Sequence, residues 1–224
     1  MPRRLLAVAV AGALALTGLA GCRDLPTVAA YVGSAQLTNA QVDHMVGEFD
    51  ADQRNRDPGL YRRGVVSIFV VREVARRLAQ ENRISVPAVD ARQLPSLAEE
   101  LHAKLGDVVL LQAEANAASG AVERLGTPQA PTEADKREVF ANLVADQVVQ
   151  PSQYDAVKDQ IDSPEMRAAL GLRAVLQDAL KRYQVSVNPR YEPLALQVPF
   201  TIGNVNTFVR LSLQPVPPAV IDAG

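Results

Sequence analysis

The residues best suited to metal binding or nucleophilic chemistry are few in this 224-residue chain: two histidines, His44 and His102, and one cysteine, Cys22. A structural zinc site takes four ligands, drawn mainly from Cys and His side chains. With so few of these, carboxylates would have to supply an unusual share of the donors, so we expect no metal site. Both histidines are expected on helix surfaces, and no cofactor is predicted.

Acidic pairs and one serine are the remaining candidates for catalysis. Glu99 and Glu100 are adjacent on an expected helix, where neighbouring side chains point in different directions. Asp50 and Asp52 lie in a polar stretch that has the character of a solvated surface. Ser119 lacks the G-x-S-x-G frame and the preceding strand of a nucleophile elbow, and no Gly-rich phosphate loop is present. The sequence therefore predicts a protein that is not an enzyme.

The N-terminus has the organisation of an export signal. Arg3 and Arg4 precede an apolar run over residues 5–20. This run is short for a membrane span and is bounded by small residues, as in a signal peptide. The Leu-Ala-Gly-Cys sequence that ends at Cys22 resembles the bacterial lipobox, whose cysteine receives a diacylglycerol and becomes the new N-terminus.

We therefore predict a lipoprotein signal peptide over residues 1–21, lipidation of Cys22 and a short tether over residues 22–27. The alternative is an ordinary secreted protein that is cut after Ala20 or Gly21. Because Cys22 is the only cysteine, it has no disulfide partner within the chain. The prediction implies attachment to the extracytoplasmic face of a cell membrane through acyl chains.

Composition excludes some classes of partner. Apolar residues make up 48% of the chain and charged residues 21%, which is enough apolar material for one core or two small ones. Without the predicted signal peptide, 21 basic residues remain against 25 acidic ones. A weakly acidic surface without a polybasic patch argues against a nucleic-acid partner.

The stretch from residue 28 to residue 49 carries the strongest local prediction. Val28–Val32 is a short run of β-forming residues that a Gly-Ser pair ends. Thr38 and Gln41 then have the spacing of a helix capping box. Apolar residues follow at the spacing of one helix face, and they are Val42, Met45, Val46 and Phe49.

Helical periodicity predicts a mainly α protein between this strand and a second one. The further helices are expected over residues 59–82, 95–105, 108–125, 133–150, 153–161 and 164–183, with a turn at 50–57 and caps at Asp57, Asp107, Thr132 and Ser163.

A strand of five residues needs a partner for its backbone hydrogen bonds. The best partner for Val28–Val32 is the segment 183–187, which follows the last helix. We therefore predict a small two-stranded sheet that closes a multi-helix domain over residues 28–191. Residues 192–224 are predicted to be an extended or partly disordered Pro-rich tail with room for one strand.

These features together resemble one family. The first strand, the capped helix after Leu37 and Thr38, the Val-Ser-Val-Asn-Pro-Arg-Tyr sequence at 185–191 and the lipobox are similar to those of actinobacterial lipoproteins. These lipoproteins are related to the N-terminal chaperone domain of SurA, and the same broad group includes PrsA and the SurA-like domain of trigger factor. The resemblance covers about residues 28–191 and implies that the first strand and helix meet a C-terminal helix and strand.

The resemblance implies a chaperone-like protein that binds unfolded or extended exported polypeptides near the membrane. Many relatives insert a parvulin-type isomerase domain, but the central region here is helical throughout, so we expect that domain to be missing. The alternatives are a membrane-anchored scaffold for one defined partner and a residual peptidyl-prolyl isomerase. Candidate peptide-binding residues are Met45, Phe49, Phe69 and Met166.

Overall fold

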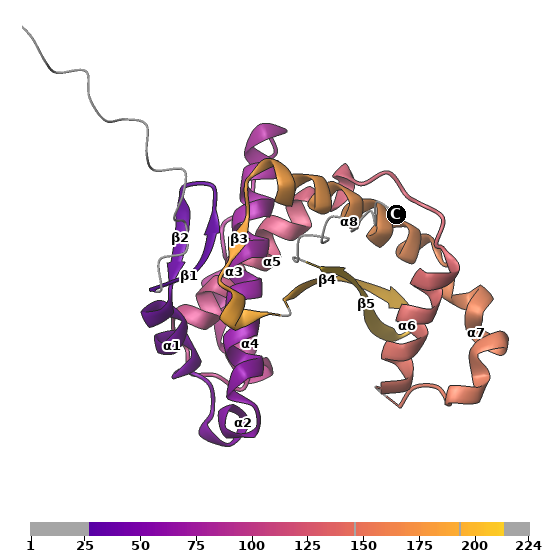
Figure 1. The fold of residues 1–224 in the computed structure, drawn as a ribbon, viewed down its shortest axis with the longest axis horizontal. Helices are drawn as coiled ribbons and strands as arrows, with labels where there is room; N and C mark the ends of the chain where they lie inside the picture. Colours follow the sequence, from indigo (N-terminus) through magenta and orange to yellow (C-terminus); the bar gives the residue numbers. More distant parts are fainter. Residues whose placement is uncertain (1–26, 146, 193, 213–224) are drawn as a thin grey trace, which may run out of the picture.

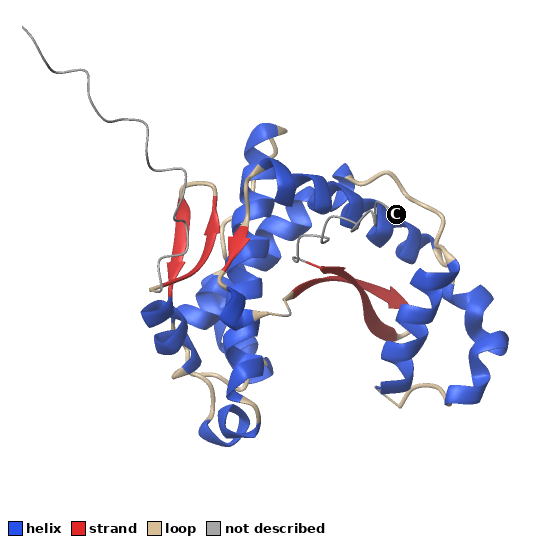
Figure 2. Cartoon of the chain, in the orientation of Figure 1, coloured by secondary structure: helices blue, strands red, loops and turns tan. Residues whose placement is uncertain are grey.

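The fold was examined in a computed structural model, which describes residues 27–145, 147–192 and 194–212, so the predicted signal peptide and Cys22 lie outside the described part. The described chain is mainly helical, as predicted (Figures 1 and 2). The helices are α1 (Asn39–Val46), α2 (Ala51–Arg56), α3 (Pro58–Glu81), α4 (Leu94–Glu100), α5 (Asp107–Val122), α6 (Glu133–Ala145), α7 (Tyr154–Ile161) and α8 (Pro164–Arg182). The strands are β1 (Val28–Val32), β2 (Ala35–Thr38), β3 (Ser186–Val187), β4 (Ala195–Ile202) and β5 (Val205–Ser212).

The predicted pairing between the two ends of the domain is confirmed. In the antiparallel pair of β1 and β3, Ala30 lies opposite Val187 and Tyr31 opposite Ser186. β2, which is not predicted from the sequence, pairs with the other edge of β1 and gives the strand order β2-β1-β3. Gly33 has a φ of +58° in the turn between β1 and β2, a conformation that glycine adopts without steric cost.

The caps predicted from local sequence are present at most helices. The Thr38 hydroxyl accepts from the Gln41 N–H (3.2 Å), and the Gln41 side chain accepts from the Thr38 N–H (2.9 Å), which completes the capping box. Asp57 and Ser163 accept in the same way from the third residue of α3 and of α8. Local spacing was a sufficient guide here because donor and acceptor lie within one turn.

α5 differs from the prediction. Asp107 is the first residue of α5 rather than its cap, and the cap comes from Glu48. The Glu48 carboxylate accepts from the Asp107 N–H (3.0 Å) and from the Val108 N–H (2.7 Å). A carboxylate satisfies the free N–H groups of a helix start and complements its positive partial charge.

Other element boundaries also differ from the prediction, and α6 ends at Ala145 rather than at residue 150. Residues 51–56, expected to be a turn, form α2, and α4 ends at Glu100, before its predicted end at residue 105. The chain leaves the helix there because residues 102–104 pair with the segment after α1. His102, whose φ is +50°, accepts from the Asp50 N–H (2.8 Å), and the Lys104 N–H donates to the Glu48 carbonyl (2.8 Å).

α3 is the central helix. It contacts α1, α5, α8 and the first sheet. Its buried face supplies much of the core and consists of Val65, Val66, Phe69, Val70, Val74, Ala75, Leu78 and Ala79. None of the described helices is long and apolar enough to cross a membrane.

The segment after β3 is more ordered than expected, because it holds two strands rather than one. β4 and β5 form an antiparallel hairpin whose register runs from Ala195–Ser212 to Ile202–Val205. Alternate side chains of β4 are buried: Leu196, Val198 and Phe200. The hairpin packs under α8 and beside α6, so it belongs to the same core (Figure 1).

Candidate functional site

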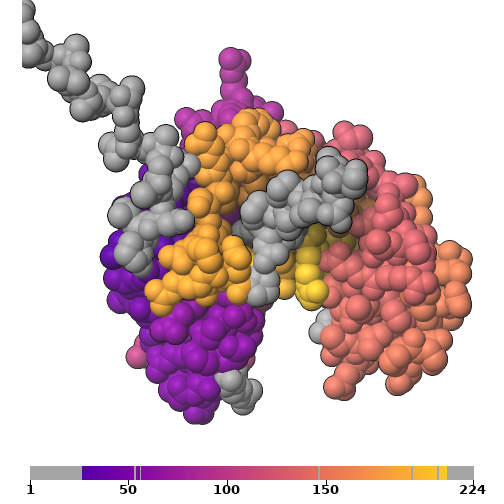
Figure 3. All heavy atoms as spheres, viewed as in Figure 1, coloured from indigo at the N-terminus to yellow at the C-terminus, as the bar shows by residue number. Residues whose placement is uncertain are grey.

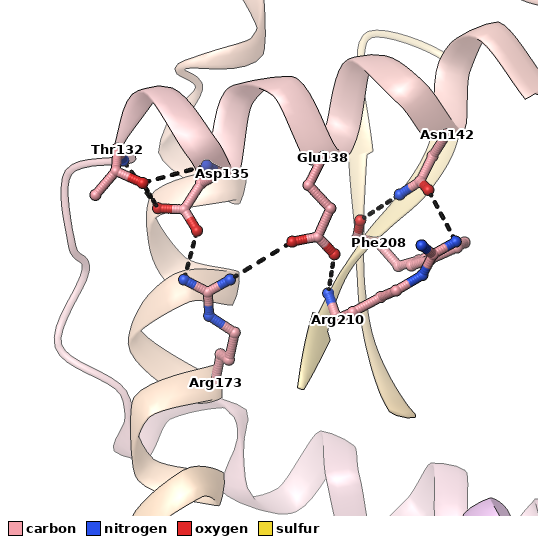
Figure 4. A network of polar contacts seen from close by, with 7 residues as sticks. All are labelled: Thr132, Asp135, Glu138, Asn142, Arg173, Phe208 and Arg210. Atoms are coloured by element: carbon pink, nitrogen blue, oxygen red, sulfur yellow. Dashed lines mark hydrogen bonds and ion pairs between the residues drawn. The ribbon is translucent and has the colours of Figure 1, made fainter. Parts of the chain in front are cut away.

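Side chains of α6 cover one edge of the hairpin (Figure 4). Asn142 donates from Nδ2 to the Phe208 carbonyl (3.0 Å), and Oε1 of Glu138 accepts from the Arg210 N–H (2.6 Å). The Arg210 guanidinium in turn donates to Oδ1 of Asn142 (3.2 Å). One outward-facing backbone group of β5 at each of these two positions therefore has a side-chain partner on α6.

Asp135 connects α6 to α8 and holds this cover in place. Its carboxylate accepts from the Thr132 N–H (2.8 Å), the Thr132 hydroxyl (2.6 Å) and the Arg173 guanidinium (2.6 Å). Burial opposes the charged form of Asp135, but the hydrogen bonds from Thr132 and Arg173 outweigh it and lower the pKa of this carboxyl. Arg173 also lies 3.9 Å from Glu138, so the α6 contacts form one network.

The other edge of the hairpin belongs to β4. In an antiparallel pair, opposed residues alternate between pairs that bond to each other and pairs whose N–H and C=O point away from the partner strand. The backbone carbonyl of Phe208 and the backbone N–H of Arg210 point outward toward α6. The backbone groups of their partners Pro199 and Gln197 therefore point outward from the other edge, on β4. Within the described chain, the backbone of these two β4 residues has no hydrogen-bond partner.

Two hollows follow this strand. One, of about 480 Å³, lies between β4, α3 and α5, and the other, of about 700 Å³, lies between β4 and α8. Pro199 lines both of them, and we call the two hollows together the β4 groove. In the space-filling view the surface is notched between the N-terminal part and the part that contains α6 and α7 (Figure 3).

The lining of the β4 groove combines apolar and polar side chains. α3 contributes Leu60 and Ile68, and Leu60 is 56% exposed. α5 contributes Gln112 and Asn116 on the same hollow. Such a lining offers both apolar contact and hydrogen bonding to an incoming chain.

The peptide-binding residues predicted from the sequence do not line this groove. Met45, Phe49, Phe69 and Met166 are all at most 8% exposed and belong to the core. Met45 and Phe69 come together at a separate hollow of about 490 Å³ between α1, α3 and α5. Phe49 packs on the Tyr61 ring, 4.7 Å between centroids, and Met166 is fully buried.

The strand residues of the β4 groove were missed because their signal lies in the segment expected to be a tail. The alternation of apolar residues from Leu194 to Phe200 indicates a strand. Pro199 does not interrupt that strand, because it occupies a position whose missing N–H would point away from β5.

One side-chain cluster has the composition of a metal site. Ligand atoms of His44, Glu48 and Asp107 lie within 4.8 Å of one another. However, both carboxylate oxygens of Glu48 already accept from the first N–H groups of α5, and the positive end of a helix opposes a cation. The geometry is that of a helix cap with an exposed histidine beside it.

Comparisons with known proteins give no relative: no family model matches the chain, and no curated protein or solved structure matches it either. The resemblance to SurA-type domains therefore stays a hypothesis.

Proposed function

We propose that this protein is a chaperone-like binder of unfolded or extended polypeptides, which it holds along the β4 groove. The observation that supports this is a strand edge that has no pairing partner among the described residues, next to a hollow with a mixed apolar and polar lining. An unfolded chain exposes both apolar side chains and unpaired backbone groups, and a groove of this kind can accept both. Binding of this type involves no covalent chemistry.

The proposed site of action is the extracytoplasmic face of the membrane. If Cys22 carries the lipid, only residues 23–27 separate it from the start of β1. Five extended residues span less than about 20 Å. The groove would then stay near the bilayer, where exported polypeptides emerge before they fold.

The test is suppression of aggregation of an unfolded client by the full chain, with one variant that fills the groove. Gly64 lies on α3 in the lining of the groove, and no described atom lies within 4 Å of the place that a Cβ would take. Gly64→Phe should therefore fold and obstruct the hollow. We expect the wild-type chain to suppress aggregation and Gly64→Phe to lose most of that effect.

Gly120→Phe is the matched control, because Gly120 also lies on a helix, with no described atom within 4 Å of its Cβ position, and is not part of the groove lining. It should act like the wild type. No suppression by the wild-type chain, or equal loss in both variants, would contradict the proposal. A pulldown that yields one stoichiometric partner in place of many weak clients would favour the scaffold alternative.

A further inference from the structure

We infer that the β4 groove takes its clients by strand addition, in which an extended segment pairs with the edge of β4 that no described residue occupies, over a short register that ends at Pro199. The inference rests on the proposed function, because it specifies how the same groove would recognise an unfolded chain. The occupant is an extended polypeptide segment with a basic side chain at one end.

The hydrogen-bonding pattern of the edge limits the register. Ala195, Gln197 and Pro199 are the alternate residues of β4 whose backbone groups point outward, away from β5. Ala195 and Gln197 each offer an N–H and a C=O, whereas Pro199 offers only its C=O. Thr201 is the next of these alternate residues, beyond the proline. The register from Ala195 to Pro199 therefore offers an added strand two donors and three acceptors.

The two edges of the hairpin differ in their surroundings. α6 covers the β5 edge through Glu138 and Asn142, while the β4 edge lies along the groove. An uncovered edge invites pairing with another chain, and a proline in an edge strand limits how far such pairing can extend. Pro199 thus restricts long edge-to-edge association but leaves room for a short client strand.

Charge on the groove defines the chemistry of the occupant further. The hollow past Pro199 is lined by Glu123 and Glu165, both exposed. Neither has an ion-pair partner among the residues that the structure describes. The charged residue on the first hollow is Arg63. A segment whose paired stretch is followed by Lys or Arg at the acidic hollow therefore fits the groove best.

Backbone N-methylation of a peptide tests strand addition directly. The probe is a fluorescein-labelled peptide of alternating Val and Ser that ends in two lysines, and its anisotropy is measured with the full chain in mild detergent. In a paired strand only every second N–H faces the edge. Methylation of the peptide N–H groups that face β4 should weaken binding about tenfold or more. Methylation of the alternate N–H groups should weaken it less than about twofold.

Equal weakening by the two methylation patterns, or no weakening by either, would overturn strand addition while the proposed function survives. No binding of the unmethylated peptide would overturn the proposed function itself, together with the inference.

A pair of variants tests the same point on the protein. Gln197→Pro removes an outward N–H without removing a hydrogen bond between β4 and β5, and Gln197→Ala keeps that N–H. We expect Gln197→Pro to weaken peptide binding about tenfold, with a thermal transition close to that of Gln197→Ala. Wild-type affinity of Gln197→Pro would contradict the inference.

The charge preference has its own readout. The double variant Glu123→Gln, Glu165→Gln should bind the lysine-tailed peptide about three- to fivefold more weakly than the wild type at low salt. Its affinity for a serine-tailed peptide should be unchanged. Equal affinity of the two peptides for the wild-type chain would overturn the preference for a basic residue.

Discussion

At the scale of single residues, two glycines fix how α8 meets the loop before α6. Gly126 and Gly171 lie so close that a Cβ on Gly171 would overlap the Thr127 carbonyl. The sequence shows Gly126 as part of a loop signal and Gly171 as an ordinary residue inside a helix. Their proximity could not be predicted, because close backbone approach depends on the packing of segments far apart in the chain.

Gly171→Ala should destabilise the fold by about 1–3 kcal/mol, because the clash is with backbone and cannot be relieved by a rotamer change. Gly120→Ala is the control. It lies in an exposed, open part of α5, so alanine should stabilise that helix by about 0.5–1 kcal/mol. Chemical denaturation measures both, and similar stability of the two variants would contradict the close contact.

Asp135 gives a pH-dependent prediction. The pKa of Asp135 lies below the ordinary value of 3.8. Its contribution to the free energy of unfolding is therefore complete above that pH and is lost as the pH falls through the lower pKa of the folded state. Asp135→Asn should therefore cost about 1–3 kcal/mol at pH 7. The difference from the wild type should shrink as the pH falls well below 3.8. An equal difference in stability between Asp135→Asn and the wild type at pH 7 and at pH 2.5 would contradict this prediction.

At the scale of elements, local signals predicted most helix starts, while contacts between distant segments decided the rest. Thr38, Asp57 and Ser163 cap their helices as the sequence predicts. The cap of α5 comes from Glu48, which lies 59 residues before Asp107, and no local pattern contains that information. The hairpin was partly visible as alternation after Leu194, but its pairing and its place under α8 depend on tertiary packing.

Glu48→Ala should remove the α5 cap and lower the free energy of unfolding by about 1–2 kcal/mol. Glu100→Ala is a suitable control, because Glu100 is an exposed glutamate at the end of α4. It should change stability by less than about 0.5 kcal/mol. Hydrogen exchange of the first turn of α5 should rise in Glu48→Ala alone, and unchanged exchange there would exclude the capping role.

At the scale of the whole molecule, the ends of the described chain hold the fold together. β3 pairs with β1, and β4 and β5 contribute Leu196, Val198, Phe200 and Val209 to the core. Removal of all residues after Gln184 should therefore abolish the cooperative thermal transition, because β1 loses its partner and the faces of α6 and α8 are uncovered. A truncated chain that unfolds at the wild-type temperature would contradict this account of the closure.

The central claim is that extended clients bind at the open edge of β4. The most direct measurement is amide hydrogen exchange at Gln197, followed by NMR with and without saturating client. The Gln197 N–H points away from β5, so it should exchange fast in the free protein and at least about tenfold more slowly with client bound. The Arg210 N–H, which already donates to Glu138, should stay the same. Unchanged exchange at Gln197 while client is bound would contradict the account.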